Sequence, residues 1–267
     1  MSISNYLFHY TCSLDKIKSI LETGFRVSRC TENVSYLQEI GILNNIDWND
    51  ALGIIQNSND SDNQSSDNTD IEKLEMSIPM ACFCDISLHD DSVANHRNIY
   101  GNYAIALDKS WGIRRGINPV SYLVPETEYS LAIKKLEVLT SEFDKTEPNY
   151  DIRNAFFKIV SFLKIYKGEF KKKDFNEDNY RFYDEREWRY IPTGDGIKIA
   201  HPSRLSEQEK NFEKYISFDS EDVKCIIVKT EEEKSELREF INNHENLLIS
   251  GSNQIELKSL GDVKKSN

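Results

Sequence analysis

The N-terminal segment carries two hydrophobic patterns in direct succession. Residues 6–11 are rich in aromatic and other strand-preferring residues, and strand alternation divides them into two faces. Leu7, His9 and Thr11 share one face, and Tyr6, Phe8 and Tyr10 share the other. Directly afterwards, apolar residues recur at helical spacing at positions 14, 17, 20 and 21, with Ser13 as the N-cap and Gly24 at the place of a left-handed C-cap. The chain is therefore predicted to open with a strand followed by a short amphipathic helix.

Further hydrophobic runs predict a mixture of strands and helices. The strand-like runs are 78–86, 103–107, 119–124, 187–192, 197–200 and 223–229. Helical spacing is clearest at 149–167, is weaker at 35–55, and recurs after Thr230, where Glu233 completes a capping-box pattern. Residues 168–180 are predicted to form a basic loop.

One stretch lacks any hydrophobic pattern. Residues 56–70 contain no apolar residue, so they cannot offset the entropy of ordering and are predicted to be a disordered surface loop. Strand-like sequence resumes at 78, which indicates an insertion and not a boundary between domains. We therefore expect a single α+β domain at 1–261, a disordered insertion at about 56–72, and a polar, frayed tail at 262–267.

Composition narrows the class of protein. The net charge of −12 disfavours long-range attraction to nucleic acid or to an anionic membrane, although the basic stretches 109–115 and 168–173 offer local positive charge. The N-terminus lacks the features of a signal peptide, and no apolar run approaches the length of a membrane span, about 18 residues. Five cysteines, an odd number, are typical of free thiols. These features together predict a cytoplasmic protein without membrane contact.

Two carboxylates near the C-terminal third are candidates for chemistry. Glu185 and Glu187, at the start of a predicted strand, would lie on one face about 7 Å apart. Two acids placed in this way can divide labour between stabilising positive charge and directing a nucleophile. The alternative is an ordinary edge strand, with Glu185, Glu187 and Arg189 facing solvent and Trp188 and Tyr190 facing inward.

Two aromatic segments are candidates for a binding site. His9 offers a ring nitrogen within a strand, or is simply a core histidine bonded to a backbone carbonyl. Tyr100 and Tyr103 flank Gly101 and can form a platform for a flat ligand, or can be ordinary packing residues. A group of possible metal ligands lacks standard spacing, so no metal is expected. That group comprises Asp85, His89, Asp90, Asp91 and His96.

In combination these segments resemble the AbiGi family of bacterial abortive-infection proteins. The resemblance covers roughly 6–30, 76–124 and 180–193. It includes Phe8-His9-Tyr10-Thr11, His96, Tyr100-Gly101-Asn102-Tyr103, Trp111-Gly112, Asn118-Pro119-Val120 and Glu185-Arg186-Glu187-Trp188-Arg189. The family's label implies a role in a toxin–antitoxin type of phage-defence module, in some cases as the antitoxin.

A wider resemblance is to ADP-ribosyltransferases, including a DarT-like opening. It implies an α+β fold with a split, mostly antiparallel sheet flanked by helices, and NAD as co-substrate. Carried over by position, Glu187 is the catalytic acid and Glu185 the extra glutamate, whereas His9, Tyr10, Thr11, Tyr100 and Tyr103 form the NAD site. The Glu-x-Glu subclass usually begins with an arginine and has a Ser-Thr-Ser motif, and neither is present, which leaves the acceptor open.

The leading hypothesis is therefore an NAD-dependent mono-ADP-ribosyltransferase that is the toxic effector of a phage-defence system. Its acceptor would be RNA, DNA or a protein, and its partner a neutralising antitoxin. Breaking the nicotinamide–ribose bond develops oxocarbenium charge, which a nearby carboxylate stabilises. The alternatives are a non-catalytic antitoxin or regulatory partner, and an NAD glycohydrolase.

Overall fold

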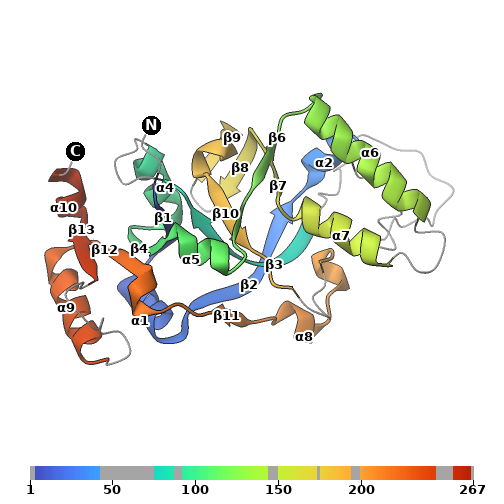
Figure 1. Ribbon diagram of the computed structural model, residues 1–267. Coiled ribbons are helices and arrows are strands. Elements are labelled where there is room, and N and C mark those ends of the chain that lie inside the picture. Colours follow the sequence, from blue (N-terminus) through green and yellow to red (C-terminus); the bar gives the residue numbers. More distant parts are fainter. Residues whose placement is uncertain are drawn as a thin grey trace, which may run out of the picture.

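The structure is a computed structural model, and it describes residues 4–42, 75–86, 92–143, 150–172, 175–193, 199–244 and 255–265. It is a mixed α+β fold. Within these residues nine strands form one twisted sheet that is mostly antiparallel, and helices cover both of its faces (Figure 1). The sheet pairs β12 with β13 in parallel, and all its other pairings are antiparallel.

The sheet consists of two parts that meet at one residue pair. The first part is β1 (Tyr6–Thr11), β4 (Tyr103–Asp108), β12 (Val223–Val228) and β13 (Glu256–Ser259). The second is β2 (Phe25–Asn33), β3 (Glu75–Cys84), β5 (Asn118–Pro119), β10 (Glu187–Tyr190) and β11 (Lys214–Ile216). β1 pairs along its whole length with β4, but with β3 only where Phe8 lies opposite Cys84. The expected α+β class with a mostly antiparallel sheet is confirmed, and the split sheet of an ADP-ribosyltransferase stays a prediction.

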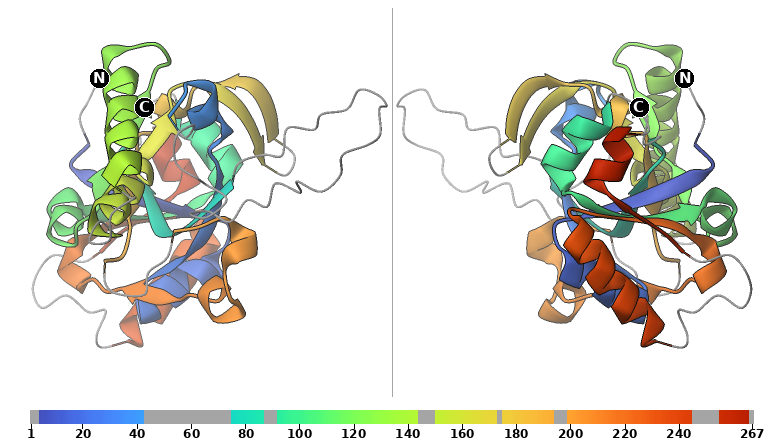
Figure 2. Two further views of the ribbon diagram at one scale, coloured as in Figure 1. Left: turned by 90° about the vertical axis from the view of Figure 1, so that its right-hand side faces the viewer. Right: turned by 90° about the vertical axis from the view of Figure 1, so that its left-hand side faces the viewer.

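Helices cover the sheet in three groups. On one face, α1 (Leu14–Thr23), α5 (Lys109–Arg114) and α9 (Glu231–Asn242) enclose the largest core cluster, and α1 and α9 pack side by side (Figure 2). On the other face, α4 (Ser92–Tyr100) and α10 (Leu260–Lys265) cover a smaller cluster around Phe8 and Cys84. At the far end of β2 and β3, α2 (Ser35–Glu39), α6 (Glu128–Phe143) and α7 (Tyr150–Val160) pack on a third cluster. α8 (Glu207–Lys210) precedes β11.

Two small sheets flank the central one. β6 (Ser121–Leu123) pairs in parallel with β7 (Leu163–Ile165), and β8 (Gly168–Lys172) forms a hairpin with β9 (Phe175–Tyr180). The single predicted strand at 119–124 is therefore two short strands, β5 and β6. The predicted basic loop at 168–180 is wrong, because its aromatic residues form the cluster that holds the hairpin. These residues are Phe170, Phe175, Tyr180 and the adjoining Phe182.

Local signals in the sequence correctly located several elements. The side chain of Ser13 accepts a hydrogen bond from Lys16 N–H and caps α1, and Thr230 and Glu233 form the predicted capping box of α9. Gly24 ends α1 with a positive φ of 92°, although its ψ of −178° is extended and not left-handed helical. The strand at 6–11 also has the predicted bounds.

Other predictions differ from the structure or lie outside it. The helix predicted at 149–167 ends at Val160, and Leu163–Ile165 is a strand. Residues 262–265 belong to α10, and Val263 is buried, whereas a frayed tail was expected. The predicted disordered insertion at 56–72, most of the weak helix at 35–55 and the first half of the strand predicted at 197–200 lie outside the described residues.

Candidate functional site

The two candidate carboxylates lie at the junction of a short helix and a strand. Glu185 ends the 3₁₀ helix η1 (Phe182–Glu185), and Glu187 begins β10. Between them, Arg186 adopts a left-handed conformation with φ 42° and ψ 50°, which is uncommon for a residue with a side chain. The chain turns sharply there, so the two carboxylates do not share one face of a single strand, as was expected. They are brought together by a third residue.

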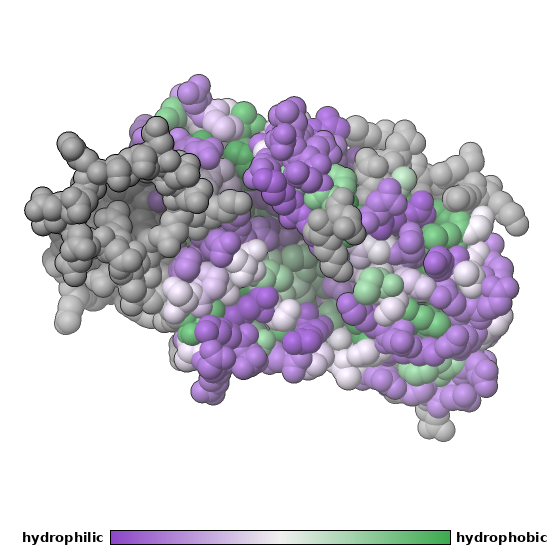
Figure 3. Space-filling model, turned by 180° about the vertical axis from the view of Figure 1, so that it is seen from behind, coloured by the Kyte–Doolittle hydropathy of each residue, from purple (hydrophilic) through white to green (hydrophobic). Residues whose placement is uncertain are grey.

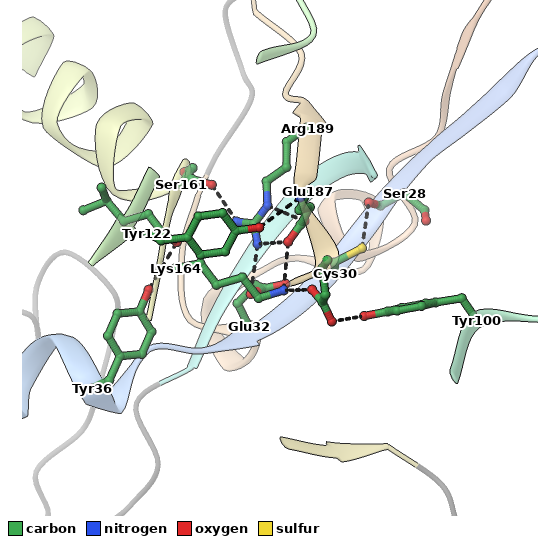
Figure 4. Close-up of polar contacts among 12 residues, drawn as sticks. Ser28, Cys30, Glu32, Tyr36, Tyr100, Tyr122, Ser161, Lys164, Glu187 and Arg189 are labelled. Atoms are coloured by element: carbon green, nitrogen blue, oxygen red, sulfur yellow. Dashed lines mark hydrogen bonds and ion pairs between the residues drawn. The ribbon is translucent and has the colours of Figure 1, made fainter. Parts of the chain in front are cut away.

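That third residue is Lys164 of β7. Its ammonium group lies 2.7 Å from the Glu185 carboxylate and 2.8 Å from the Glu187 carboxylate (Figure 4). The expectation from the resemblance named neither this lysine nor its segment, which was predicted to be helical. Lys164 is thus the residue that joins the two carboxylates in a single site.

Arg189 completes a buried network of charges around Glu187. Its guanidinium group donates to both carboxylate oxygens of Glu187, at 2.6 and 3.2 Å, and lies 3.3 Å from Glu32 of β2. It also donates to the Ser161 carbonyl at 2.7 Å, just beyond the C-terminus of α7. The exposed fractions of Glu185, Glu187 and Arg189 are 3%, 7% and 1%. The alternative of a solvent-facing edge strand is therefore wrong, because these three side chains point inward.

Electrostatic effects fix the charge states of this network. Burial alone would raise the pKa of Glu187, but the positive charges of Arg189 and Lys164 outweigh burial and hold that pKa well below its usual range. Burial likewise opposes the charged form of Lys164, and the carboxylates of Glu185 and Glu187 raise its pKa well above the usual value. At neutral pH Glu187 is an anion held between two cations.

A row of aromatic rings borders the carboxylates. Tyr100, at the end of α4, donates its hydroxyl to Glu185 at 2.6 Å. The His96 ring lies between Tyr100 and Tyr10, with centroid distances of 4.5 and 4.8 Å. Burial and the nearby charges of Lys172 and Lys164 lower the pKa of His96 to about 4, so its imidazole is neutral at physiological pH. The buried Tyr10 hydroxyl has no hydrogen-bond partner within the part of the chain that the structure describes.

These residues line one cavity of about 790 Å³. Its walls come from β1, β2, β3, α2, α4, β7, β8, η1 and the start of β10. Its lining includes Tyr10, His96, Tyr100, Lys164, Glu185 and Glu187. This volume lies in the range of cavities that bind small molecules. On the rear face of the molecule, hydrophilic residues border a hollow whose floor is more hydrophobic (Figure 3).

Five of the seven residues expected to bind NAD or to catalyse contribute to the cavity lining. These are His9, Tyr10, Tyr100, Glu185 and Glu187. Thr11 is buried away from it, and Tyr103 is directed to the opposite side of the sheet, where its hydroxyl donates to Glu233 at 2.6 Å. The pair of tyrosines around Gly101 is therefore not a single platform.

His9 contributes to the cavity lining, but its ring belongs to the other face of the sheet. Phe8, Cys84 and Glu187 lie opposite one another in the register and share one face, so the neighbouring His9 points to the other. There its ring packs against Phe25 and Phe83, and Nδ1 lies 2.9 Å from the Cys82 carbonyl oxygen. Burial lowers the pKa of His9. This geometry agrees with the alternative prediction, in which His9 is a core histidine bonded to a backbone carbonyl.

The group of possible metal ligands does not assemble among the described residues. Asp85 pairs with Lys109 at 2.7 Å, and His96 packs between tyrosines. His89, Asp90 and Asp91 lie outside the described residues, and no cluster of three metal-ligating side chains occurs in the part of the chain that is described. None of the helices within the described residues is long and apolar enough to cross a membrane.

Comparison with known proteins places this site in a family. Residues 54–229 match the model of the family described as "Putative abortive phage resistance protein AbiGi, antitoxin". The matched residues include Lys164, Glu185, Glu187 and Arg189, but not β1.

A curated relative supports this match. The abortive phage resistance protein AbiGi of Lactococcus lactis subsp. cremoris is 37% identical over 140 residues, which are 48% of this chain and 55% of that protein. The chain thus spans about half the length of this relative, and no solved structure matches it. The chain belongs to the AbiGi family of abortive phage resistance proteins.

Proposed function

We propose that this chain is the antitoxin of an abortive-infection module, and that it acts by binding a partner protein and not by catalysis. The family's description as an antitoxin supports this role. The structural observation that carries the proposal is the complete internal pairing of Glu187, whose two oxygens are held by Arg189 and Lys164.

A carboxylate paired in this way is poorly suited to stabilise a developing cation. Lys164 and Arg189 bring two positive charges to the two negative charges of Glu185 and Glu187. A transition state gains only from interactions that are stronger than in the ground state, and the charge of Glu187 is already neutralised by its neighbours. The network instead ties β10, β7, η1 and β2 together. It is therefore a structural element of a binding protein.

A second candidate is the NAD-dependent ADP-ribosyltransferase, and one observation favours it. Tyr10, Tyr100, Glu185 and Glu187, which come from distant parts of the sequence, line a single cavity. The fit to NAD is incomplete, because the ring of His9 packs on the other face and neither Thr11 nor Tyr103 lines the cavity. For this candidate the acceptor would be RNA, DNA or a protein.

The two candidate functions predict different effects on bacterial growth when the chain is expressed alone and when it is expressed with neighbouring genes. For an antitoxin we expect normal growth of a bacterial host that expresses the chain alone, and rescue of growth when the chain is expressed with a toxic neighbouring gene. Glu187→Gln should rescue as well as the wild type wherever it accumulates to the same level.

A biochemical assay tests the enzyme directly. Purified chain is incubated with labelled NAD and cell lysate, beside the Glu187→Gln variant. Label on macromolecules that disappears in the variant would refute the non-catalytic proposal and support the transferase. Release of free ADP-ribose without labelled macromolecules would instead identify an NAD glycohydrolase.

A further inference from the structure

The β8–β9 hairpin stands apart from the central sheet. β8 pairs with β9 and with no other strand in the part of the chain that is described, and the two strands form a sheet of their own. Neither strand packs extensively against another helix or strand among the described residues. The hairpin projects from the body of the molecule above α4 (Figure 2). A two-stranded hairpin is only marginally stable by itself, so a few side-chain contacts must hold it in place.

One end of the hairpin is anchored by aromatic rings. At this end Gly168 lies opposite Tyr180. The Phe170 ring stacks on Tyr180 at a centroid distance of 4.8 Å and meets Phe182 of η1 edge-on at 5.5 Å. Phe182 is buried, and η1 leads directly to Glu185. The anchored end is therefore fixed beside the network of charges.

The other end of the hairpin reaches across to α4. All of β8, residues 168–172, lines the cavity together with parts of β1, β3 and α4. Lys172, the last residue of β8, places its ammonium group 3.9 Å from the centre of the Tyr100 ring in α4. Tyr100 in turn donates its hydroxyl to Glu185. The contact between Lys172 and Tyr100 thus links the hairpin to α4 and, through it, to the carboxylates.

This contact is weak enough to open while the rest of the fold stays intact. Lys172 is exposed, and a cation–π contact at an exposed position shifts an equilibrium only about two- to fivefold. The hydrogen bonds between β8 and β9 are internal to the hairpin, so they are kept when the hairpin moves as a unit. The hairpin therefore combines a fixed base with a weak contact at its far end.

We propose that the β8–β9 hairpin is a lid of the cavity, hinged at its anchored end and latched by the contact of Lys172 with Tyr100. The structure holds the lid closed. Opening of the lid gives small molecules access to the ammonium group of Lys164 and to the two carboxylates that it joins. This inference goes beyond the proposed function, because it concerns access to the cavity and holds for an antitoxin and for an enzyme alike.

The native cysteines report on opening of the lid. Cys82 is partly buried and lines the cavity, Cys12 is exposed, and Cys225 is buried outside the cavity. The folded full chain is treated with a maleimide reagent, and labelling of each cysteine is followed by mass spectrometry. When the lid opens and closes faster than the reagent reacts, the labelling rate of Cys82 follows the population of the open state. We expect Cys82 to react more slowly than Cys12 and faster than Cys225.

Variants of the latch test the contact itself. Lys172→Met should accelerate labelling of Cys82 about two- to fivefold and leave labelling of Cys225 unchanged. Lys171→Met is the matched control, because Lys171 is an exposed neighbour in the same strand that pairs with Glu169. It should leave labelling of Cys82 unchanged.

Variants of the ring separate the latch from the hydroxyl group of Tyr100. Tyr100→Leu removes both the ring and the hydroxyl, whereas Tyr100→Phe removes only the hydroxyl. Labelling of Cys82 should therefore be faster in Tyr100→Leu than in Tyr100→Phe. Adding Lys172→Met to Tyr100→Leu should give no further acceleration, because the contact that it removes is already absent.

Three results would overturn the proposal. Labelling of Cys82 as fast as that of Cys12 in the wild type would mean that the cavity is open without movement of the hairpin. Labelling of Cys82 at the rate of Cys225 in every variant would mean that only global unfolding exposes it. Equal acceleration by Lys171→Met and Lys172→Met would mean that the contact with Tyr100 is not the latch.

Discussion

Removing the Lys164 ammonium group should destabilise the protein strongly. The side chain of Lys164 is 12% exposed, and its ammonium group is within 2.8 Å of both Glu185 and Glu187. In Lys164→Met the two buried carboxylates lose their shared counter-ion, while Tyr100 and Arg189 remain beside them. Breaking a buried ion pair in this way typically costs about 3–5 kcal/mol, because an uncompensated charge stays behind.

The expected change is large enough to measure directly. For a chain of this size, a loss of about 1 kcal/mol lowers the melting temperature by roughly 2–4 °C, so the melting temperature should fall by about 6–20 °C. Thermal and urea unfolding at pH 7, followed by circular dichroism, give both quantities. The control is Lys167→Met, which removes an exposed lysine from the same region and should change the free energy of unfolding by less than about 0.5 kcal/mol.

A second variant separates charge from packing. If the cost of Lys164→Met is the unpaired carboxylates, adding Glu185→Gln and Glu187→Gln should recover part of the lost stability, and the effects should be clearly non-additive. A loss below about 1 kcal/mol in Lys164→Met, or strict additivity with the glutamine substitutions, would refute the reasoning. Either result would mean that the three charges are not a coupled, buried network.

Three further predictions concern pH and backbone geometry. The pKa of Glu187 in the folded protein is below the ordinary value of 4.5, so its contribution to stability is complete above pH 4.5 and declines as the pH falls further. In Glu187→Gln, the free energy of unfolding in urea should therefore depend less on pH below 4.5. The pKa of His96 is lowered from 6.5 to about 4, so NMR should show a neutral ring at pH 6, and His96→Asn should remove the decline in stability between pH 6.5 and 4. A ring that titrates near pH 6.5 would contradict its burial. Gly101→Ala should cost about 1–3 kcal/mol in thermal unfolding, because φ is 119° and a Cβ atom would collide with the Thr11 carbonyl; an unchanged melting temperature would be inconsistent with that contact.

Elements controlled by neighbouring residues could be predicted from the sequence. The first strand, the Ser13 cap of α1 and the Thr230–Glu233 capping box depend on contacts within a few residues, and the structure contains all three. Such signals are readable because both partners of each interaction are close in the sequence.

The helix predicted at 149–167 shows why the bounds of other elements were predicted wrongly. Its helical spacing continues through 166, but the helix ends at Val160 and Arg189, from a strand far along the chain, donates to the Ser161 carbonyl. The next residues, Leu163–Ile165, pair with β6 instead. Both interactions come from segments remote in sequence, so local periodicity contains no trace of them. Because these residues form β7 and not a helix, Lys164 lies in the site.

Several members of the candidate site could be predicted from the sequence, but the directions of their side chains could not. Tyr10, Tyr100, Glu185 and Glu187 line one cavity, whereas their roles toward NAD stay predictions. The directions of individual side chains depend on sheet register, and a shift of one residue moves a side chain to the other face. His9 therefore packs in the opposite core although its neighbour Tyr10 lines the cavity.

The balance of charge around Glu187 is what separates the two proposed functions. The two negative charges of Glu185 and Glu187 are matched by the two positive charges of Lys164 and Arg189, which contact them directly. Glu32, whose side chain is 27% exposed, adds a third negative charge on the far side of Arg189 and does not contact Lys164 or Glu187. A site that stabilises an oxocarbenium ion needs an uncompensated negative charge close to the reacting carbon, which here would require Lys164 to leave both carboxylates. That movement would break two buried contacts before any substrate contact replaced them. A binding protein requires no such rearrangement, because the network in its observed state already joins the strands and helices around the cavity.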